Sequence, residues 1–277
     1  MTSSGAFLHH LREALKKAPA CLVTVQQTEG STPRERGAWM AVAADAVVGT
    51  IGGGHVEFQA IAEARRRLAG GPGAAVLRYA LGPSLGQCCG GVMHLRYEQV
   101  TQADAAALVA RLTPRQVPVA LFGGGHVGQA LARVLAPLPF ALTWIDSRDG
   151  VFPPDVAPGV ACEHSDPVQA AVPGLAPGSR VLIMSFSHAE DLDVVAACLR
   201  RQRERGDLPF IGLIGSRSKW ATFRHRLHER GFAETELAQV TCPIGVPGIA
   251  GKAPEVIAVA VAAQLLQTLP ADGQEDA

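Results

Sequence analysis

Over residues 1–113, short runs in which every second residue is apolar stand between runs in which apolar residues recur every three or four positions. They predict helices and short strands in the order helix 6–17, strands 22–25, 39–42 and 47–51, helix 56–69, strands 75–80 and 92–97, and helix 103–112. Glycine and proline separate the strands. This pattern predicts a small α+β domain.

The pattern changes after a proline-containing linker at 113–118. Apolar strands now alternate with amphipathic helices, as strand 117–122, helix 126–135, strands 141–146, 160–163 and 180–186, helix 188–204, strand 209–214, helix 217–230, strand 238–242 and helix 254–268. Alternation of this kind predicts an α/β fold with a parallel, doubly wound sheet. We therefore expect two domains, 1–113 and 117–269, and a flexible tail over 270–277.

Composition excludes several classes of protein. The 277 residues are 48% hydrophobic and 18% charged, which is typical of a globular chain. The 25 basic and 25 acidic residues cancel, so no net charge attracts nucleic acid or an anionic membrane. The longest apolar run, 256–263, is too short to span a bilayer, and the N-terminus lacks the features of a signal peptide. We expect a cytoplasmic protein.

A glycine motif opens the second domain. Gly123, Gly125 and Gly128 stand between an apolar strand and a helix, and Asp146 ends the next strand. This arrangement is the Rossmann-type dinucleotide fingerprint, in which the amides hold phosphate and the acid binds a ribose diol. The alternative is a Rossmann scaffold that binds no dinucleotide. His126 faces the ligand or is an ordinary side chain at the start of the helix.

A second glycine turn, Gly52, Gly53 and Gly54 followed by His55, repeats part of this motif in the first domain. Its amides could hold an anion, although a plain tight turn explains it as well. The repeat is incomplete, because Glu57 stands where the second copy has Gly128.

Further candidates follow later strands of the parallel sheet. Ser185 and His188 come after one strand, and Ser216, Arg217 and Lys219 come after the next. The carboxyl ends of such strands are where α/β proteins bind ligands, and Ser216 can cap a helix whose N-terminus binds phosphate. Ordinary helix starts and solvated side chains are the alternative explanation.

Two adjacent thiols, Cys88 and Cys89, lie in a glycine-rich stretch without apolar periodicity. Neighbouring Cα atoms are about 3.8 Å apart, less than the roughly 4.4 Å that a disulfide normally requires, so we expect free thiols. Such thiols could bind a soft metal or accept sulfur. The other four cysteines are expected to be buried. They are Cys21, Cys162, Cys198 and Cys242.

Several stretches together resemble the XdhC/CoxI family, the xanthine dehydrogenase accessory proteins. The cysteine stretch Leu81-Gly-Pro-Ser-Leu-Gly-Gln-Cys-Cys-Gly-Gly91 is the most specific of them. The others are Gly30-Ser-Thr-Pro-Arg34, Gly49-Thr-Ile-Gly-Gly-Gly54, Ser185-Phe-Ser-His188, Gly212-Leu-Ile-Gly-Ser-Arg217-Ser-Lys219 and the segment 242–252.

The resemblance implies a chaperone, not a turnover enzyme, that binds molybdenum cofactor (molybdopterin). It would support sulfuration of the cofactor with a cysteine desulfurase and insert the cofactor into xanthine dehydrogenase. Cys88 or Cys89 would contact the molybdenum. Some relatives carry cysteine in place of His55, so a second thiol contact is either absent from this chain or replaced by imidazole. We expect the cofactor between the two domains, with its phosphate near a glycine turn or Ser216.

Two other functions remain open at this point. Gly123 to Gly128 with Asp146 would suit an NAD(P)-dependent oxidoreductase, and the two thiols would suit a simple sulfur or metal carrier. A homodimer is also expected, because the protein must present a cofactor to a large partner.

Overall fold

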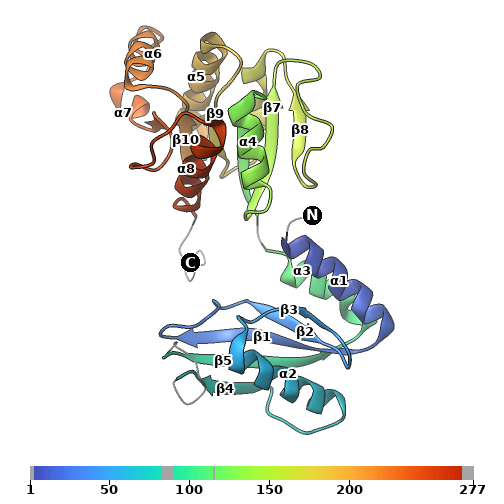
Figure 1. Cartoon of the computed structure of the whole chain (residues 1–277). Helices are drawn as coiled ribbons and strands as arrows, with labels where there is room; N and C mark the ends of the chain where they lie inside the picture. The colour runs from blue at the N-terminus through green and yellow to red at the C-terminus, as the bar shows by residue number, and fades with distance from the viewer. Residues whose placement is uncertain (1–2, 83–89, 115, 270–277) are drawn as a thin grey trace. The chain divides into compact units, whose positions relative to one another are not determined.

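The computed structural model describes residues 3–82, 90–114 and 116–269, and it divides into two compact units (Figure 1). The first unit is Ser3–Thr113, and the second begins at Pro114. The predicted tail 270–277 lies outside the described residues. Within the described ranges, no helix is both long and apolar enough to cross a membrane.

The first unit is built on an antiparallel sheet of strand order β3-β2-β1-β5-β4. Its elements are α1 (Ser3–Lys17), β1 (Ala20–Glu29), β2 (Trp39–Val42), β3 (Val47–Gly49), α2 (Gly54–Leu68), β4 (Val76–Ala80), β5 (Val92–Val100), the 3-10 helix η2 (Gln102–Asp104) and α3 (Ala105–Leu112). The predicted α+β domain is confirmed. β1 is longer than the predicted strand 22–25, because its polar second half pairs with β5 as far as Glu29.

Both faces of this sheet are covered, and alternate residues of β1 supply both cores. Cys21, Val23 and Val25 pack in the core that contains α2 residues. Ala20 and Leu22 pack in a separate core with residues of α1 and α3. Figure 1 shows α2 on one side of the sheet and the α1–α3 pair on the other. A strand buried on both faces explains why the run 20–25 is almost entirely apolar.

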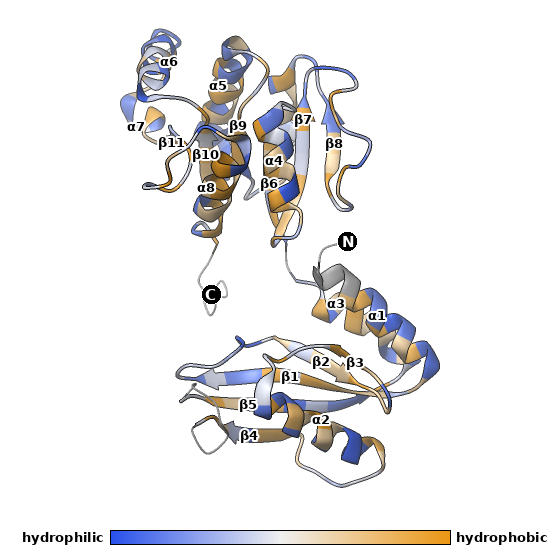
Figure 2. Ribbon diagram, viewed as in Figure 1, coloured by the Kyte–Doolittle hydropathy of each residue, from blue (hydrophilic) through white to orange (hydrophobic). Residues whose placement is uncertain are grey.

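The second unit is a six-stranded sheet of order β11-β10-β9-β6-β7-β8, parallel throughout. Its elements are β6 (Val117–Phe122), α4 (His126–Leu135), β7 (Phe140–Asp146), β8 (Ala161–His164), η3 (Val168–Gly174), β9 (Arg180–Ile183), α5 (His188–Arg205), β10 (Phe210–Leu213), α6 (Arg217–Glu229), α7 (Glu234–Leu237), β11 (Val240–Thr241) and α8 (Pro254–Leu266). The predicted parallel Rossmann-type sheet is confirmed. Figure 2 shows α8 mainly in the apolar colour and α6 mainly in polar and neutral colours.

Strand order reverses between β6 and β9, the two neighbours at the centre of the sheet. From β6 the chain continues to one side through β7 and β8, and after η3 it returns to β9 on the other side. The turns that follow β6 and β9 therefore start side by side at the carboxyl edge and lead to opposite sides of the sheet. In open α/β sheets this switch point is the usual ligand position.

Three sequence predictions need correction in this unit. The strand predicted over 180–186 ends at Ile183, and the polar run after it is a turn into α5. The strand predicted over 238–242 is the two-residue β11, preceded by the unpredicted helix α7. Cys162, expected to be buried, is exposed, because β8 is an edge strand whose four residues are all exposed.

Close packing at the turn after β6 depends on two glycines. Gly123 has a φ of 122°, and a Cβ there would overlap the carbonyl oxygen of Met184. A Cβ on Gly128 would overlap the carbonyl oxygen of Gly123, which also accepts a 2.9 Å hydrogen bond from the Trp144 indole. These glycines let α4 approach the sheet, so both have a structural role.

We predict that Gly128→Ala lowers the free energy of unfolding of the second unit by about 1–3 kcal/mol, because the added methyl group has no space. Gly174→Ala is the matched control: a methyl group added there would meet no neighbouring atom within 4 Å, and the glycine has no positive φ. It should change stability by no more than about 1 kcal/mol. Urea denaturation followed by circular dichroism measures both, and equal effects would contradict the proposed packing role.

Candidate functional site

Three family-like stretches of the first unit meet at one place. The Leu81 amide donates to the Gly91 carbonyl oxygen at 2.8 Å, and the Gly91 amide donates to the Ser31 carbonyl oxygen at 3.1 Å. A Cβ on Gly52 would lie 2.6 Å from Pro33 Cβ. The turn at 49–54, the loop at 30–34 and the two described ends of the cysteine stretch are therefore neighbours.

Cys88 and Cys89 themselves lie outside the described residues, which include Leu81, Gly82, Gly90 and Gly91 at the two ends of their segment. Gly91 is buried, and a Cβ there would overlap the backbone of Glu29 and Ser31. This close packing explains why the motif has a glycine at this position.

A broad hollow of about 530 Å³ adjoins this place on the α2 face. It is lined by His55, Phe58 and Gln59 from the start of α2 and by Tyr79 from β4, together with Ala62, Glu63 and Arg66. Phe58 is 71% exposed, which is high for a phenylalanine. The His55 ring is exposed and lies 3.0 Å from the Gln59 amide nitrogen, measured at Nε2. The hollow offers aromatic faces and an imidazole.

The Gly52 and Gly53 amides of the turn at 52–54 are not free, although the sequence suggested that they would be. Glu57 folds back from the first turn of α2, and its Oε2 accepts hydrogen bonds from the Ile51 and Gly53 amides, both at 3.0 Å, and from the Thr50 hydroxyl. The Gly52 amide donates to Thr50 Oγ1 at 3.0 Å. An internal carboxylate thus occupies the position expected for an external anion, and this correction removes Gly52 and Gly53 as phosphate donors.

The predicted residues of the second unit do gather at one edge. Parallel strands end on the same side, so the turns after β6, β7, β9 and β10 are neighbours there. These turns carry Gly123, Gly125, His126, Gly128, Asp146, Ser185, His188, Ser216, Arg217 and Lys219. The sequence predicted that these residues lie at one edge, but it did not predict what each side chain contacts.

Within this edge the start of α4 is open. Gly125 is the N-cap of α4 and makes no side-chain capping bond, and a Cβ built on it would meet nothing within 4 Å. His126 is exposed beside it. The first amides of a helix that lack a capping side chain attract anions.

Asp146 is not free at the end of β7. Its carboxylate accepts hydrogen bonds from the Gly124 amide at 2.6 Å and from the backbone and guanidinium of Arg148 at 2.9 Å. Burial works to raise the pKa of Asp146, but the hydrogen bonds from Arg148 and Gly124 outweigh it and hold the pKa below its ordinary value. The ribose-binding acid predicted from the sequence is engaged by its own chain.

Lys219 and Ser216 also have internal partners. The Lys219 ammonium lies 2.6 Å from Asp191 Oδ2 and donates to the Ile214 carbonyl at 2.9 Å. Asp191 is buried, and its other oxygen accepts from the Ser185 amide at 2.7 Å, so this ion pair joins the turns after β9 and β10. Ser216 caps α6 through the Lys219 amide at 3.1 Å. Arg217 remains exposed.

Sequence reasoning missed the roles of Glu57, Arg148 and Phe186. Glu57 was visible as the residue that breaks the repeat between the two glycine turns. Arg148 follows Asp146 by two residues, a spacing that allows the side chain to fold back on the strand end. Phe186 gave no signal, because a phenylalanine after an apolar strand predicts burial, whereas it is 67% exposed.

The described cysteines are poor candidates for reactive thiols. Burial raises the pKa of Cys21 and Cys242 to about 11 and that of Cys198 to about 12. Cys162 is exposed on β8, and partial burial of its thiol also raises its pKa. No group of three His, Cys, Asp or Glu side chains suited to a metal occurs within residues 3–82, 90–114 and 116–269.

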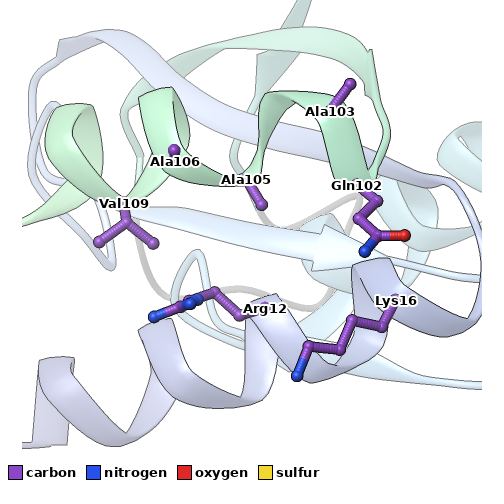
Figure 3. A pocket seen from close by; sticks show the side chains of 7 residues that line it. All are labelled: Arg12, Lys16, Gln102, Ala103, Ala105, Ala106 and Val109. Carbon is purple, nitrogen blue, oxygen red and sulfur yellow. The ribbon is translucent and has the colours of Figure 1, made fainter.

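A second hollow of the first unit, of about 470 Å³, lies between α1 and the η2–α3 segment. Figure 3 shows Arg12 and Lys16 of α1 facing Gln102 and the small side chains of the other wall. Because α1 and α3 pack on the opposite face of the sheet from α2, this hollow is separate from the one beside His55.

We predict that Glu57→Ala lowers the free energy of unfolding of the first unit by about 1–3 kcal/mol, because the Ile51 and Gly53 amides lose their acceptor. Glu57→Gln keeps an acceptor oxygen and should cost less. Glu13→Ala, on the surface of α1, is the control and should leave the unfolding midpoint unchanged. Urea denaturation measures all three, and a Glu57→Ala protein as stable as the control would show that the turn does not depend on this carboxylate.

Comparison with known proteins places this geometry in a family. Residues 14–80 match the pattern of the XdhC and CoxI family, and residues 119–265 match that of the XdhC Rossmann domain. The uncharacterized protein YqeB of Escherichia coli (strain K12) is 30% identical over 260 residues, which are 91% of this chain and 44% of YqeB. The chain thus spans less than half the length of that relative.

A solved structure from Bacillus halodurans, described as a xanthine dehydrogenase, shares the fold. The two structures superpose with a TM-score of 0.74, and their sequences are 19% identical. The match covers 97% of this chain and 96% of the Bacillus halodurans chain. Together the two family patterns span most of both units, including the turn at 49–54 and the whole carboxyl edge of the parallel sheet. The chain belongs to the XdhC and CoxI family.

Proposed function

We propose that this protein is an accessory protein that binds molybdenum cofactor, holds it during sulfuration and delivers it to xanthine dehydrogenase. The observation that carries the proposal is the meeting of the 30–34 loop, the 49–54 turn and the ends of the cysteine segment beside an open aromatic hollow. Family membership supports the same function. The proposal makes the protein a carrier and not a turnover enzyme.

The residues at this place suit a molybdopterin. Its molybdenum accepts thiolate or sulfide ligands, and Cys88 or Cys89 supplies a thiol from a segment whose two ends are fixed at the site. Phe58 and Tyr79 offer aromatic faces for a flat heterocycle, and the His55 imidazole is a polar group at the same hollow. The Gly52-Gly53 amides take no part, since Glu57 and Thr50 occupy them.

The two cysteines of the segment also suit sulfur transfer. A thiolate can carry, as a persulfide, the sulfur that a cysteine desulfurase hands over from its own persulfide. The pKa values of Cys21, Cys198 and Cys242 are raised to about 11 or 12 by burial, which leaves these thiols protonated and unreactive at neutral pH. Among the cysteines outside the segment, only Cys162 is exposed.

We predict that Cys88→Ser or Cys89→Ser, or both, removes most of the molybdenum bound after incubation with purified cofactor, because a serine hydroxyl stays protonated at neutral pH and does not replace a thiolate ligand. The measurement is molybdenum per protein by mass spectrometry after gel filtration. Cys162→Ser is the matched control, since it removes an exposed thiol elsewhere, and it should retain full stoichiometry.

Transfer is tested with the same variants. The loaded wild-type protein should activate cofactor-free xanthine dehydrogenase, and the variant that fails to bind molybdenum should not. Full molybdenum stoichiometry in both single variants and in the double variant would contradict a role for the cysteine segment. Persulfide on these residues without pterin binding would instead identify a simple sulfur carrier.

A further inference from the structure

The carboxylate at the end of β7 has no free capacity for a sugar. Both oxygens of Asp146 are used: Oδ1 accepts from the Arg148 amide and Nε, and Oδ2 accepts from the Gly124 amide and from Arg148 Nη2. The residue is only 2% exposed. In Rossmann proteins that bind an unphosphorylated adenosine ribose, the acid at this position accepts the ribose hydroxyls. Here those acceptor positions are filled.

Arg148 covers the carboxylate and faces outward. Its side chain is 35% exposed, and Nη1 takes no part in the bonds to Asp146. The guanidinium carbon lies 4.5 Å from the centre of the Phe186 ring, which comes from the turn after β9. A bidentate partner and an aromatic face fix the orientation of the guanidinium, so its free N–H groups are preorganised.

Other features of the same edge fit a polar ligand. The start of α4 is open beside Gly125, as a phosphate approach requires. At the neighbouring turn, Ser185 Oγ and Glu190 Oε2 are shielded atoms without a hydrogen-bond partner in the described part of the chain. Glu190 is tied to the turn after β7 through Ser147 at 2.7 Å. Unpartnered polar atoms of this kind are unusual in a folded protein unless a ligand or water pairs with them.

We propose that this edge binds a dinucleotide that carries a phosphate on its adenosine ribose, as NADP does, and that Arg148 recognises that phosphate. An unphosphorylated ribose would have to break the Arg148–Asp146 fork to reach the acid. A phosphate needs no such change, because it accepts from the N–H groups of Arg148 that Asp146 does not use, while the fork neutralises Asp146. Glu190, the other carboxylate that acts on Arg148, has an unpartnered oxygen that can accept from a ribose hydroxyl. Phe186 and the guanidinium plane offer surfaces for the adenine.

This inference is independent of the proposed cofactor delivery, because it concerns residues of the second unit only. Nucleotide binding can fail while molybdenum binding succeeds, and the reverse also holds. The two proposals are therefore tested by separate measurements.

The experiment is titration of the purified full chain with NADPH and NADH, followed by nucleotide fluorescence and by calorimetry. Charge-assisted hydrogen bonds to one phosphate predict roughly ten- to hundredfold tighter binding of NADPH. Arg148→Ala should abolish or invert this preference, because it exposes the Asp146 carboxylate to the ribose. Arg200→Ala, an exposed arginine in the second half of α5, is the matched control and should keep the wild-type ratio.

Competition on the wild-type protein gives a second measurement that needs no variant to fold. Adenosine 2′-phosphate should displace the bound nucleotide at least roughly tenfold more effectively than adenosine 5′-phosphate, for the same charge-assisted bonds. Equal or tighter binding of NADH, binding of neither nucleotide, or an unchanged ratio in a folded Arg148→Ala protein would each overturn the proposal.

Discussion

Carboxylates of the chain's own side chains accept hydrogen bonds from backbone amides in its turns, and this interaction shapes both candidate regions. Glu57 closes the turn at 49–54, Asp146 holds the turn after β6 through Gly124, and Asp191 holds the turn after β9 through Ser185. Each contact fixes a turn that would otherwise expose unpaired amides. Each also removes those amides from the set that can bind an external anion.

Both glycine turns of the chain are held by a carboxylate, but the two carboxylates come from different places in the sequence. The turns share the letters Gly-Gly-Gly-His-Val, yet in the first the position after the valine is Glu57, which returns to the turn, and in the second it is Gly128, which lets α4 pack on the sheet. Neither of the helices that follow has a side-chain cap, at Gly53 for α2 or at Gly125 for α4. Similar local sequence thus gives two turns closed by different carboxylates, Glu57 from the helix that follows and Asp146 from the end of the next strand.

Lys219 and Arg148, two cations at the carboxyl edge of the parallel sheet, have different roles because their ion pairs leave them different numbers of free donors. Lys219 is largely buried against Asp191 and joins two turns, so it stabilises the edge and has little freedom to meet a ligand. Arg148 is also paired, but its guanidinium has donors left over and stays partly exposed. An arginine can neutralise one anion and still bind another, because its planar fork offers five donors, whereas a lysine ammonium is a single compact charge.

The sequence alone determined the order and type of most elements, because most helices and strands here carry a clear apolar periodicity, and it identified the family-like stretches but not that three of them meet. It did not determine the ends of β1 and β9 or the short α7, where strand pairing and turns override the local pattern. Nor could it show that Lys219 is paired with Asp191, that Asp146 is paired with Gly124 and Arg148, or that Phe186 is exposed, because side-chain conformations and contacts between turns are set only in the folded chain. Only the tertiary structure decides which donors and acceptors at a shared edge pair with each other and which remain for a ligand.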